Sequence, residues 1–533
     1  MGIPSYFSYI VKNHIEIIKK LVKQQMKIHN LYMDCNSIIY DAVRSIDSLE
    51  CLPNQNKIII NRVVTKIEEY IALIGPKSIV YIAFDGVAPV AKLEQQRTRR
   101  YKSWFQNEMT KTLFNKTGSE HWNTSAITPG TAFMSELNDS IYNHFSDASK
   151  YGVDRLIVST SNIVGEGEHK IFQYIRDNPD MHSAQTSVVY GLDADLIMLS
   201  INHLPISRNI YLFRETPEFI KSIDASLEPN ETYLMDIPLL ADIITHDMNN
   251  GMSSMVHNNN RVYDYIFLCF FLGNDFMPHF PAINIRTGGV DKMLNAYKAT
   301  IGNTNECLTD GKTIYWKNVR KVIAFLVDME DKYIQNEMKL RDKREKYKYP
   351  TDTPEKKYLK FEAIPTYERE LEKYINPFKN GWQQRYYKSL FKVDRDEERC
   401  KQISINYLQG LEWTMKYYTT GCPDWRWCYQ YNYPPLLQDL LKYIPYFDTS
   451  FIKPNNFNAV SPLTQLCYVL PKQSLHMLPK PIYNKLMDGH PEWYPTDCEF
   501  VWAYSKYFWE SHVELPVLDI GEVEELVLDS IIQ

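Results

Sequence analysis

Acidic residues recur at the ends of apolar segments along this chain, and their arrangement carries the clearest chemical meaning. They lie in five short motifs: LYMDCNS, YIAFDGVAP, VGEGEHK, YGLDADLIM and LGNDFMPH. The seven carboxylates are those of Asp34, Asp85, Glu166, Glu168, Asp193, Asp195 and Asp275. So many converging negative charges would raise one another's pKa unless a cation neutralised them. Divalent ions with oxygen ligands, Mg²⁺ first, suit a site made only of carboxylates, which predicts metal-dependent phosphodiester chemistry.

Each acidic motif also has a simpler structural interpretation. Glu166 and Glu168 could form the acidic first turn of a helix, and Asp193 or Asp195 could cap one. Asp275, in a Gly-Asn-Asp sequence, could belong only to a turn. These alternatives account well for single acids but poorly for the set. Glycines beside the two glutamates would allow a ligand to approach the backbone closely, although this pair alone favours a helix turn. Two such paired motifs at successive predicted strand ends favour a shared metal site.

A basic segment follows the second acidic motif directly. The sequence KLEQQRTRRYK, residues Lys92–Lys102, holds five basic side chains and one acid. On a helix, the spacing of four of its residues would place them close to one face: Lys92, Gln96, Arg99 and Arg100. Such side chains can hold a terminal phosphate through charge-assisted and bidentate hydrogen bonds. An exposed basic helix is the alternative, but the position beside the acids favours a phosphate pocket.

Aromatic residues concentrate in one stretch of the second half. Nine of them fall within Tyr407–Tyr433, among them Trp413, Trp425 and Trp427. Most such rings are expected to lie in a hydrophobic core. One or two at the surface would be enough to stack on the bases of a single strand, an interaction that contributes about 1–3 kcal/mol per base.

The elements that must position these side chains alternate along roughly the first 280 residues. Short runs rich in Ile, Val and Tyr predict strands at Asn30–Ile39, Ser78–Asp85, Arg155–Thr160, Ser187–Leu192 and Ile210–Arg214. Longer periodic segments predict helices at Lys57–Ile74, Ala91–Phe114, Ala132–Ser149, Glu168–Arg176 and Asp236–Met248. The alternation indicates an α/β fold, a mostly parallel twisted sheet flanked by helices. Sites in such sheets lie at the carboxyl ends of the strands, where Asp85 and Asp193 are expected.

The rest of the sequence changes in character. We expect a first domain over residues 1–300, a charged helical connector over 301–360, and an α-rich irregular region over 361–533 that packs on the first. A long charged helix is predicted at Asn318–Lys348, closed by Tyr349-Pro350. After Phe361, Pro and aromatic residues become more frequent and the regular alternation fades.

Composition limits the class of protein. With 533 residues and 44% apolar side chains, the chain is long enough for two globular domains. Its net charge is −6, so a site for a polyanion must be a local basic patch. The nine cysteines show no zinc-ligand spacing, and the sequence shows no signal peptide or membrane-spanning stretch. We expect a reduced, intracellular setting.

Taken together, the motifs resemble those of the Xrn family of 5′-to-3′ exoribonucleases. The resemblance lies in MGIPSYF, DCNSIIY, FDGVAPVAKLEQQRTRRYK, ITPGTAFM, GEGEHKI, YGLDADLI and FLGNDFMPHFP. It continues through GLEWTMKYYTTGCPDWRW, LTQLCYVLPKQSLHMLP and YPTDCEFVW. These motifs cover nearly the whole chain in order, and several of them are highly specific.

The resemblance implies a nuclease core related to flap endonucleases and PIN domains, with two Mg²⁺ ions that Mn²⁺ can replace. The seven carboxylates take the family's seven acidic positions, which are catalytic and metal-binding. The four residues of the basic face match the family's pocket for a 5′-monophosphate: Lys92, Gln96, Arg99 and Arg100. In the family this pocket is too tight for a cap or a triphosphate.

Two departures from the family concern the stacking platform and the length of the chain. The family usually has a His where this chain has Tyr40, and stacks the first bases of the substrate on it. Tyrosine can stack in the same way but cannot be protonated. Trp413 is the expected stacking residue of the second region, with Trp425 and Trp427 as alternatives. The sequence ends about where the family's shared core ends, without the long extension of cytoplasmic members or the zinc knuckle of many nuclear ones.

The resemblance implies a processive 5′-to-3′ exoribonuclease. Its substrate would be single-stranded RNA with a 5′-monophosphate, hydrolysed by two metal ions to nucleoside 5′-monophosphates. We expect a monomer in the cytoplasm rather than the nucleus, with no membrane partner. A structure-specific flap or DNA nuclease on the same core is one alternative. A non-catalytic RNA-binding scaffold is another, although retention of all seven acids argues against it.

Overall fold

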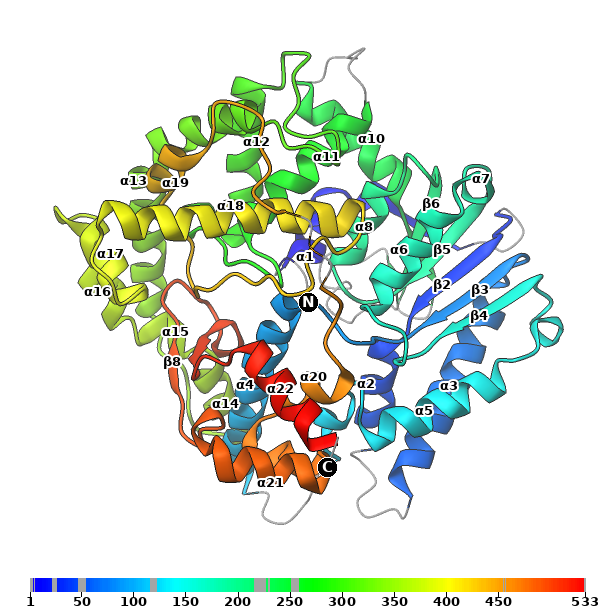
Figure 1. Cartoon of the computed structure of the whole chain (residues 1–533). Helices are drawn as coiled ribbons and strands as arrows, with labels where there is room; N and C mark the ends of the chain where they lie inside the picture. Colours follow the sequence, from blue (N-terminus) through cyan, green and yellow to red (C-terminus); the bar gives the residue numbers. More distant parts are fainter. Residues whose placement is uncertain are drawn as a thin grey trace.

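The computed structural model describes most of the chain (Figure 1). The described residues are 3, 5–21, 26–46, 54–115, 122–214, 227–228, 231–250, 258–453, 455 and 457–531. A seven-stranded sheet occupies one side of the molecule, and the other side carries helices α13 (Trp316–Glu345), α16 (Glu370–Ile375), α17 (Trp382–Leu390) and α18 (Glu397–Thr419) (Figure 1). The expected fold class, a mostly parallel sheet flanked by helices with an α-rich region packed on it, is confirmed.

Five strands of the sheet run parallel, and two antiparallel strands close one edge. The parallel strands are, in spatial order, β4 (Arg155–Ser159), β3 (Ile79–Ala83), β2 (Asn30–Asp34), β5 (Thr186–Tyr190) and β6 (Asn209–Phe213). The edge consists of β7 (Tyr233–Asp236) and β1 (Ile18–Lys20). The chain adds β3 and β4 on one side of β2 and later β5 and β6 on the other. In open parallel sheets, ligands bind at such a switch point.

The predicted parallel strands agree with the structure to within one residue at their starts. The expectation that the first strand runs to Ile39 is wrong, because β2 ends at Asp34 and helix α2 (Asn36–Arg44) follows. Ile38, Ile39 and Val43 of α2 bury one face of this helix in the core. A continuous apolar run does not by itself distinguish a strand from a short buried helix. The two antiparallel edge strands were not predicted.

Helices cover both faces of the sheet. One face is covered by α2, α3 (Gln55–Ile74) and α5 (Ala132–His144). The other is covered by α6 (Gly167–Asp177), α8 (Asp195–Asn202) and α10 (Ile237–Met248). Along β2, Leu31 belongs to the core under α2, α3 and α5, and Tyr32 belongs to the core on the opposite face, as the two-residue period of a strand requires.

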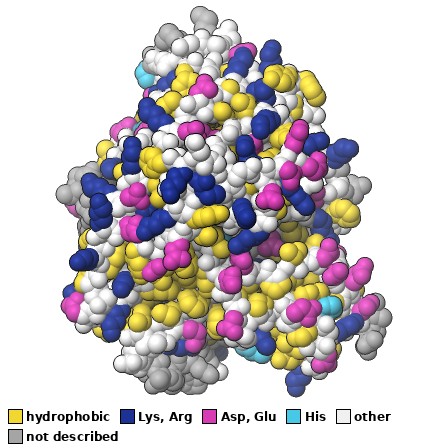
Figure 2. Space-filling view, turned by 90° about the vertical axis from the view of Figure 1, so that its left-hand side faces the viewer, with side chains coloured by type: hydrophobic (Ala, Val, Ile, Leu, Met, Phe, Trp, Pro, Cys, Tyr) yellow, Lys and Arg dark blue, Asp and Glu magenta, His cyan; other side chains and the backbone are white. Residues whose placement is uncertain are grey.

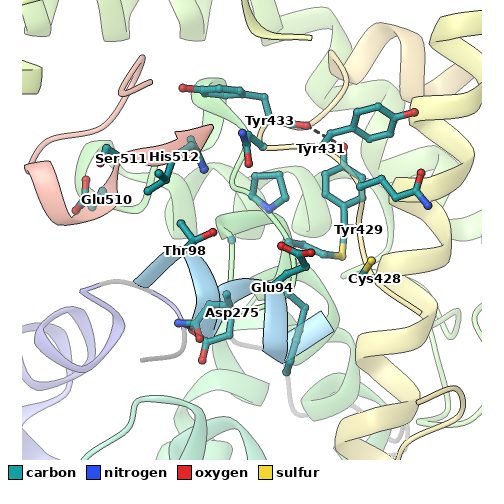
Figure 3. Close-up of a pocket in the computed structure, with 18 of the residues that line it drawn as sticks. Glu94, Thr98, Asp275, Cys428, Tyr429, Tyr431, Tyr433, Glu510, Ser511 and His512 are labelled. Carbon is teal, nitrogen blue, oxygen red and sulfur yellow. Dashed lines mark hydrogen bonds between the residues drawn. The ribbon is translucent and has the colours of Figure 1, made fainter. Parts of the chain in front are cut away.

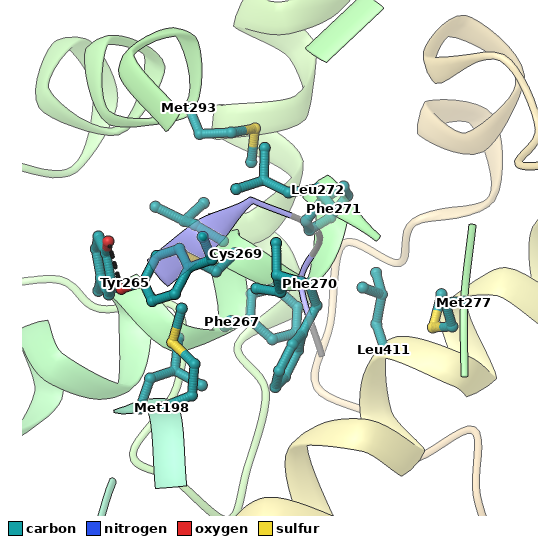
Figure 4. Packing of buried hydrophobic residues seen from close by; sticks show 14 of the residues in the cluster. Met198, Tyr265, Phe267, Cys269, Phe270, Phe271, Leu272, Met277, Met293 and Leu411 are labelled. Carbon is teal, nitrogen blue, oxygen red and sulfur yellow. Dashed lines mark hydrogen bonds between the residues drawn. The ribbon is translucent and has the colours of Figure 1, made fainter. Parts of the chain in front are cut away.

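The helical region shares a hydrophobic core with the sheet. Its longest helices are α13 (Trp316–Glu345), which confirms the predicted long charged helix, and α18 (Glu397–Thr419). The shorter ones are α11 (Asn258–Cys269), α12 (Gly289–Thr300), α14 (Pro354–Glu362), α15 (Ile364–Tyr367), α16 (Glu370–Ile375), α17 (Trp382–Leu390) and α19 (Leu437–Tyr443). Figure 4 shows part of this core, where Phe270 lies among Met198 of α8, Met293 of α12 and Leu411 of α18. The domain boundaries at residues 300 and 360 stay a prediction.

Helix α4 (Val90–Phe114) connects the sheet to the C-terminal segment. Leu93 packs against Leu466 and Val523 in a small third core. Arg97 is buried and donates hydrogen bonds to the carbonyl oxygens of Trp493 and Pro516, at 3.2 and 2.8 Å. The C-terminal elements are α20 (Pro462–Val469), α21 (Lys480–Gly489), β8 (Glu499–Val501), β9 (His512–Glu514) and α22 (Ile520–Ile531). Within the described ranges, no helix combines the length and the apolar character needed to cross a membrane.

Charges of both signs are mixed over the face that carries α13, α16 and α17 (Figure 2). Beneath this face, Glu372 of α16 is buried and holds two buried arginines. Its carboxylate accepts hydrogen bonds from Arg341 Nε at 2.8 Å and from Arg369 Nε at 2.7 Å. The backbone amide of Tyr504 donates a third, at 2.7 Å. One carboxylate therefore joins α13, α16 and the segment before β9.

Glu372→Ala is expected to destabilise the protein strongly. The substitution leaves Arg341 and Arg369 buried without their shared carboxylate, and breaking a buried ion pair typically costs about 3–5 kcal/mol. Urea denaturation followed by circular dichroism measures the free energy of unfolding. The control is Glu370→Ala, which removes an exposed glutamate of the same helix and should change stability by less than about 0.5 kcal/mol. Equally small losses in both variants would contradict this role of Glu372.

Candidate active site

The carboxyl ends of neighbouring strands bring acidic residues to one edge of the sheet. Asp34 is the last residue of β2, Asp85 lies two residues after β3, and Asp193 lies three residues after β5. Since β2 lies between β3 and β5, these three carboxylates come from adjacent strand ends. They therefore meet at the switch point of the sheet.

The motif that holds Glu166 and Glu168 reaches the same place through a close backbone contact. Gly167 begins α6 between Glu166 and Glu168, and its amide donates a 2.7 Å hydrogen bond to Asp85 Oδ1. A Cβ atom on this glycine would lie 2.7 Å from Asp34 Oδ1 and 3.4 Å from Asp85 Oδ1. A larger residue would collide with the strand-end carboxylates. The glycine between the two glutamates therefore allows α6 to begin close to Asp34 and Asp85.

A buried lysine supplies positive charge to this cluster. Lys92 of α4 is 8% exposed, and its Nζ lies 2.6 Å from both Glu166 Oε1 and Asp275 Oδ2. Asp275 comes from the loop after η4 (Phe270–Leu272), at the end of α11. Burial opposes the charged form of Lys92, but the two carboxylates outweigh it and raise its pKa well above its usual value. Lys92 thus forms ion pairs with the acids, whereas the sequence analysis predicts it in the pocket for a 5′-phosphate.

The carboxylates repel one another in this buried position. Burial and then the charge of its acidic neighbours raise the pKa of Asp34 and of Glu168 well above the usual value. Burial, followed by the charge of Asp275, raises the pKa of Asp195 to about 7. The pKa of Asp275 itself is lowered, because the nearby Lys92 ammonium outweighs the effect of burial. The cluster therefore carries more negative charge than its own cation balances.

Carboxylates held in this way suit a divalent cation. Within the described residues, the oxygens Asp34 Oδ1, Glu168 Oε2 and Asp195 Oδ1 are buried and have no hydrogen-bond partner. Oxygen ligands of this kind are preferred by Mg²⁺ and Mn²⁺. No three Asp, Glu, His or Cys side chains of the described segments already stand at positions that could hold one ion. The acids would therefore have to shift on binding a metal, and Lys92 would move away from its present partners.

Two tyrosines of α18 contact the acids from the helical region. The Tyr417 hydroxyl donates a 2.8 Å hydrogen bond to Glu166 Oε2, and its ring stacks on His169 with the centroids 3.7 Å apart. The neighbouring Tyr418 lies within electrostatic range of Asp195. Both tyrosines are buried. Helix α18 therefore holds Glu166 by a hydrogen bond and places a second tyrosine near Asp195.

Two polar side chains brace the ends of the strands. Asn36 donates a 2.6 Å hydrogen bond to Asp85 Oδ2 through its amide nitrogen, and its oxygen accepts one of 3.0 Å from the Asp85 backbone. Lys170 donates to the carbonyl oxygens of Phe84 and Thr160, at 2.8 and 2.9 Å. Burial lowers the pKa of Lys170 to about 8. The loops after β3 and β4 are held together by these contacts.

Four of these positioning residues were not singled out from the sequence: Asn36, Lys170, Tyr417 and Tyr418. Asn36 and Lys170 lie inside the motifs LYMDCNS and VGEGEHK, each two residues after an acid, and this proximity was an available signal. For the two tyrosines the only local signal was their place in the aromatic segment. Their contact with the acids depends on how α18 packs, which the local pattern does not specify.

The other residues of the predicted phosphate pocket lie on α4 near Tyr40. Gln96, Arg99 and Arg100 are all half-buried. Arg100 donates a 2.7 Å hydrogen bond to Thr128 Oγ1, and Tyr40 of α2 is within electrostatic range of both guanidinium groups. The structure thus brings these side chains together beside the acid cluster. That they bind a 5′-phosphate, and that Tyr40 stacks on a base, stay predictions.

The aromatic segment lies mostly in the core, as expected. Trp413 is fully buried, donates a 2.8 Å hydrogen bond to the Asp424 carbonyl and stacks on Trp427 with ring centroids 5.3 Å apart. This burial corrects the expectation of base stacking for Trp413, because neither face of its ring is open. Trp425 is half-buried, and its carbonyl accepts a hydrogen bond from Val90 at the start of α4. Trp427 is half-buried as well, so base stacking by Trp425 or Trp427 stays a prediction.

Comparison with known families agrees with this architecture. The family model described as "XRN 5'-3' exonuclease N-terminus" matches residues 1–216, which include the parallel strands. The model described as "Xrn1 helical domain" matches residues 256–366 and 351–528. This chain belongs to the Xrn exoribonuclease family. Its sheet region is accordingly a PIN-like nuclease domain, and its helical region is the Xrn helical domain.

Curated relatives match the Xrn chain along almost its whole length. It is 26% identical to the 5'-3' exoribonuclease 2 of Arabidopsis thaliana, over 97% of this chain and 66% of that protein. The Drosophila melanogaster 5'-3' exoribonuclease 2 homolog is 26% identical, over 97% and 70%. The Saccharomyces cerevisiae 5'-3' exoribonuclease 1 is also 26% identical, over 97% and 42%. The chain thus spans less than two thirds of the Arabidopsis protein and less than half of the yeast one.

Lys92→Met is expected to destabilise this Xrn chain when divalent cations are absent. It leaves Glu166 and Asp275 buried without their counter-ion, a loss of about 3–5 kcal/mol. Added Mg²⁺ should then raise the melting temperature of the variant more than that of the wild type, because the ion and the ammonium neutralise the same carboxylates. Thermal melting followed by circular dichroism, in EDTA and in Mg²⁺, measures both effects.

The matched control for this experiment is Lys111→Met. Lys111 is an exposed lysine of the same helix, 2.9 Å from Glu108, and its loss should leave both melting curves close to those of the wild type. If all three proteins responded equally to Mg²⁺, Lys92 and the ion would not share a site.

Proposed function

We propose that this chain is a processive 5′-to-3′ exoribonuclease that hydrolyses single-stranded RNA from a 5′-monophosphate end. The products would be nucleoside 5′-monophosphates, formed with two divalent ions. The observation that carries the proposal is the convergence of carboxylates from five separate segments at one sheet edge, beside the buried Lys92. The curated relatives are named as 5'-3' exoribonucleases, which supports the 5′-to-3′ direction of degradation and RNA as the substrate.

The acid cluster is the part of the chain that would hold the ions, Mg²⁺ or Mn²⁺. Divalent ions at such a site supply Lewis acidity, which activates water and offsets the charge that develops on the leaving oxygen. The carboxylates need not act as general bases themselves. Hydrogen bonds from Tyr417 and Asn36 orient Glu166 and Asp85 and so restrict the positions that these carboxylates can take.

The basic face of α4 would select the 5′ end. Arg99 and Arg100 are half-buried, so hydrogen bonds to a phosphate there compete less with water and gain strength. Tyr40 lies beside them and could stack on the first base. Stacking and backbone contacts carry little sequence information, so substrate choice should depend on the 5′ group and on strandedness.

Each cycle of the proposed hydrolysis creates a new 5′-monophosphate, the group that the predicted phosphate pocket recognises. An oxygen of water bonds to the phosphorus of the first phosphodiester, the bond from phosphorus to the 3′ oxygen of the first nucleotide breaks, and a proton passes to that oxygen. The released unit is a nucleoside 5′-monophosphate, and the shortened RNA carries a new 5′-monophosphate. A pocket specific for this group can therefore bind each new end in turn, which supports processive action.

Replacing Asp193 and Asp195 together by Ala is expected to abolish degradation while RNA binding is kept. The site loses two carboxylates, and losing several kcal/mol of charge stabilisation lowers the rate by about 10³-fold or more. A time course on 3′-labelled 5′-monophosphate RNA measures the rate, and filter binding in EDTA measures affinity. The exposed Asp177→Ala serves as the control. Retained degradation would place the reaction elsewhere. The same assay on 5′-phosphorylated DNA and on branched duplexes distinguishes this activity from that of a flap or DNA nuclease.

Arg99→Ala is expected to lessen the preference for a 5′-monophosphate over a 5′-triphosphate. Loss of a charge-assisted hydrogen bond of about 1.5–3 kcal/mol should slow degradation of monophosphorylated RNA by about tenfold or more, with a smaller effect on triphosphorylated RNA. Initial rates on the two RNAs, compared with those of Lys111→Ala on the same helix, give the ratio. An unchanged ratio in Arg99→Ala would mean that the 5′ group is read at another place.

A further inference from the structure

A large cavity adjoins the acid cluster on a second face of α4 (Figure 3). Its volume is about 1040 Å³, at the upper end of the range of about 300–1,000 Å³ typical for ligand sites. Thr98 and Lys102 of α4 line it, whereas Gln96 and Arg100 do not. Arg99 belongs to the lining and lies between the two faces of the helix. The cavity is therefore distinct from the predicted phosphate pocket but borders it.

The cavity extends from the acids to the surface of the molecule. At its inner end lies Asp275, whose side chain is 4% exposed, with Gln95 Nε2 at 3.5 Å from its Oδ1. At its outer end the lining includes Val517, which is 94% exposed, and the exposed Gln430. A small molecule that left the acids past Asp275 would reach solvent through this space.

Aromatic rings form one wall of the cavity. Tyr429, Tyr431 and Tyr433 follow one another at alternate positions of an extended segment (Figure 3). The rings of Tyr429 and Tyr431 lie 5.5 Å apart, and Tyr431 is half-buried, so part of its ring remains accessible. An aromatic surface of this kind binds a nucleobase by stacking.

Buried polar atoms in the walls lack partners. The Tyr433 hydroxyl, Ser511 Oγ and Gln95 Oε1 are buried and make no hydrogen bond within the described chain, and Ser511 is 1% exposed. Buried groups of this type cost free energy unless a partner satisfies them. A ligand with several hydrogen-bonding groups, such as a base and a ribose, would supply those partners.

Charges of both signs line the cavity, with Lys102 and Glu94 on α4 and Asp275 at the inner end. Lys102 Nζ donates to the carbonyl oxygens of Trp509 and Ser511, at 2.8 and 2.9 Å, and so carries its charge beside the wall. A phosphate near Lys102 would therefore meet a cation that the predicted phosphate pocket leaves free to bind it.

We propose that this cavity is a second nucleotide site, which receives the nucleoside 5′-monophosphate after it leaves the acid cluster. The phosphate would lie at Lys102, which the predicted phosphate pocket does not use, and the base against Tyr431. This inference rests on the proposed function, because its ligand is the product of that reaction. The released nucleotide must clear the acids before the shortened RNA can advance, and an exit on a different face of α4 lets both movements occur without collision.

Thr98→Trp tests the site by filling it. The indole would occupy space between α4 and the tyrosine wall while Arg99, Lys102 and the rings remain. The matched control is Thr112→Trp, the same change at an exposed position of the same helix. A 5′-monophosphate oligonucleotide at saturation, in EDTA so that it is not cleaved, occupies the predicted phosphate pocket, and calorimetric titration with AMP then reports the second site alone.

The wild type and Thr112→Trp are expected to bind one equivalent of AMP beside the oligonucleotide. Thr98→Trp should bind AMP at least about tenfold more weakly. Tyr431→Ala should weaken it by about fivefold or more through loss of stacking, with the exposed Tyr446→Ala as its control, so that the test survives if one variant misfolds. Ribose 5-phosphate and inorganic phosphate should bind more weakly than AMP, because neither carries a base.

Turnover measurements distinguish failure of this proposal from failure of the proposed function. In Mg²⁺, Thr98→Trp should slow steady nucleotide release more than it slows the first cleavage, because product release becomes limiting. If the wild type released nucleotides but bound AMP only in competition with RNA, or if Thr98→Trp bound AMP as the wild type does, the second site would be refuted. If the wild type released no nucleotide from RNA at all, the proposed function would fail, and with it the identity of the ligand as a product.

Discussion

Repulsion among buried carboxylates is the constraint on which the rest of this structure depends. Each buried charge is costly unless a counter-charge or a hydrogen bond accompanies it, and here several lie within reach of one another. Lys92 offsets part of the charge at Glu166 and Asp275, and hydrogen bonds from the helical region offset more. The pKa of Asp195, raised to about 7, shows that the compensation is incomplete. Incomplete compensation of this kind is typical of a functional site, because it leaves free energy that a bound cation can recover.

The same constraint explains why the sheet and the helical region share one hydrophobic core. The strand ends supply Asp34, Asp85 and Asp193, but the balancing groups come from α4 and α18. A small displacement of either helix would separate a carboxylate from its partner. The aromatic and aliphatic core around Phe270 holds α8, α12 and α18 together and so fixes these distances (Figure 4). Packing far from the acids therefore determines their electrostatics.

Features that depend on local pattern could be predicted from the sequence, and features that depend on packing could not. Strand positions and the acidic motifs follow from short-range periodicity, so the strand-end placement of Asp85 agrees with the structure. The helix at Asn36–Arg44 was missed because a short apolar run fits both a strand and a buried helix. The burial of Trp413 depends on its contact with Trp427 and Phe276, and no spacing rule reports such a contact. Lys92 fits a helical face pattern, yet its partners are 74 and 183 residues away in sequence.

Helix α4 shows how one element can serve several needs through its different faces. Arg97 points into the C-terminal segment and anchors the helix, while Lys92 reaches the acids from its first turns. Arg100 and Tyr40 flank one side, and Thr98 and Lys102 line the cavity on another. Because the helix is anchored along its length, these faces keep fixed orientations relative to one another. Under the proposed function, recognition of the 5′ end, cleavage and departure of the product would then take place on different faces of one helix, since neighbouring helical residues are rotated by roughly 100°.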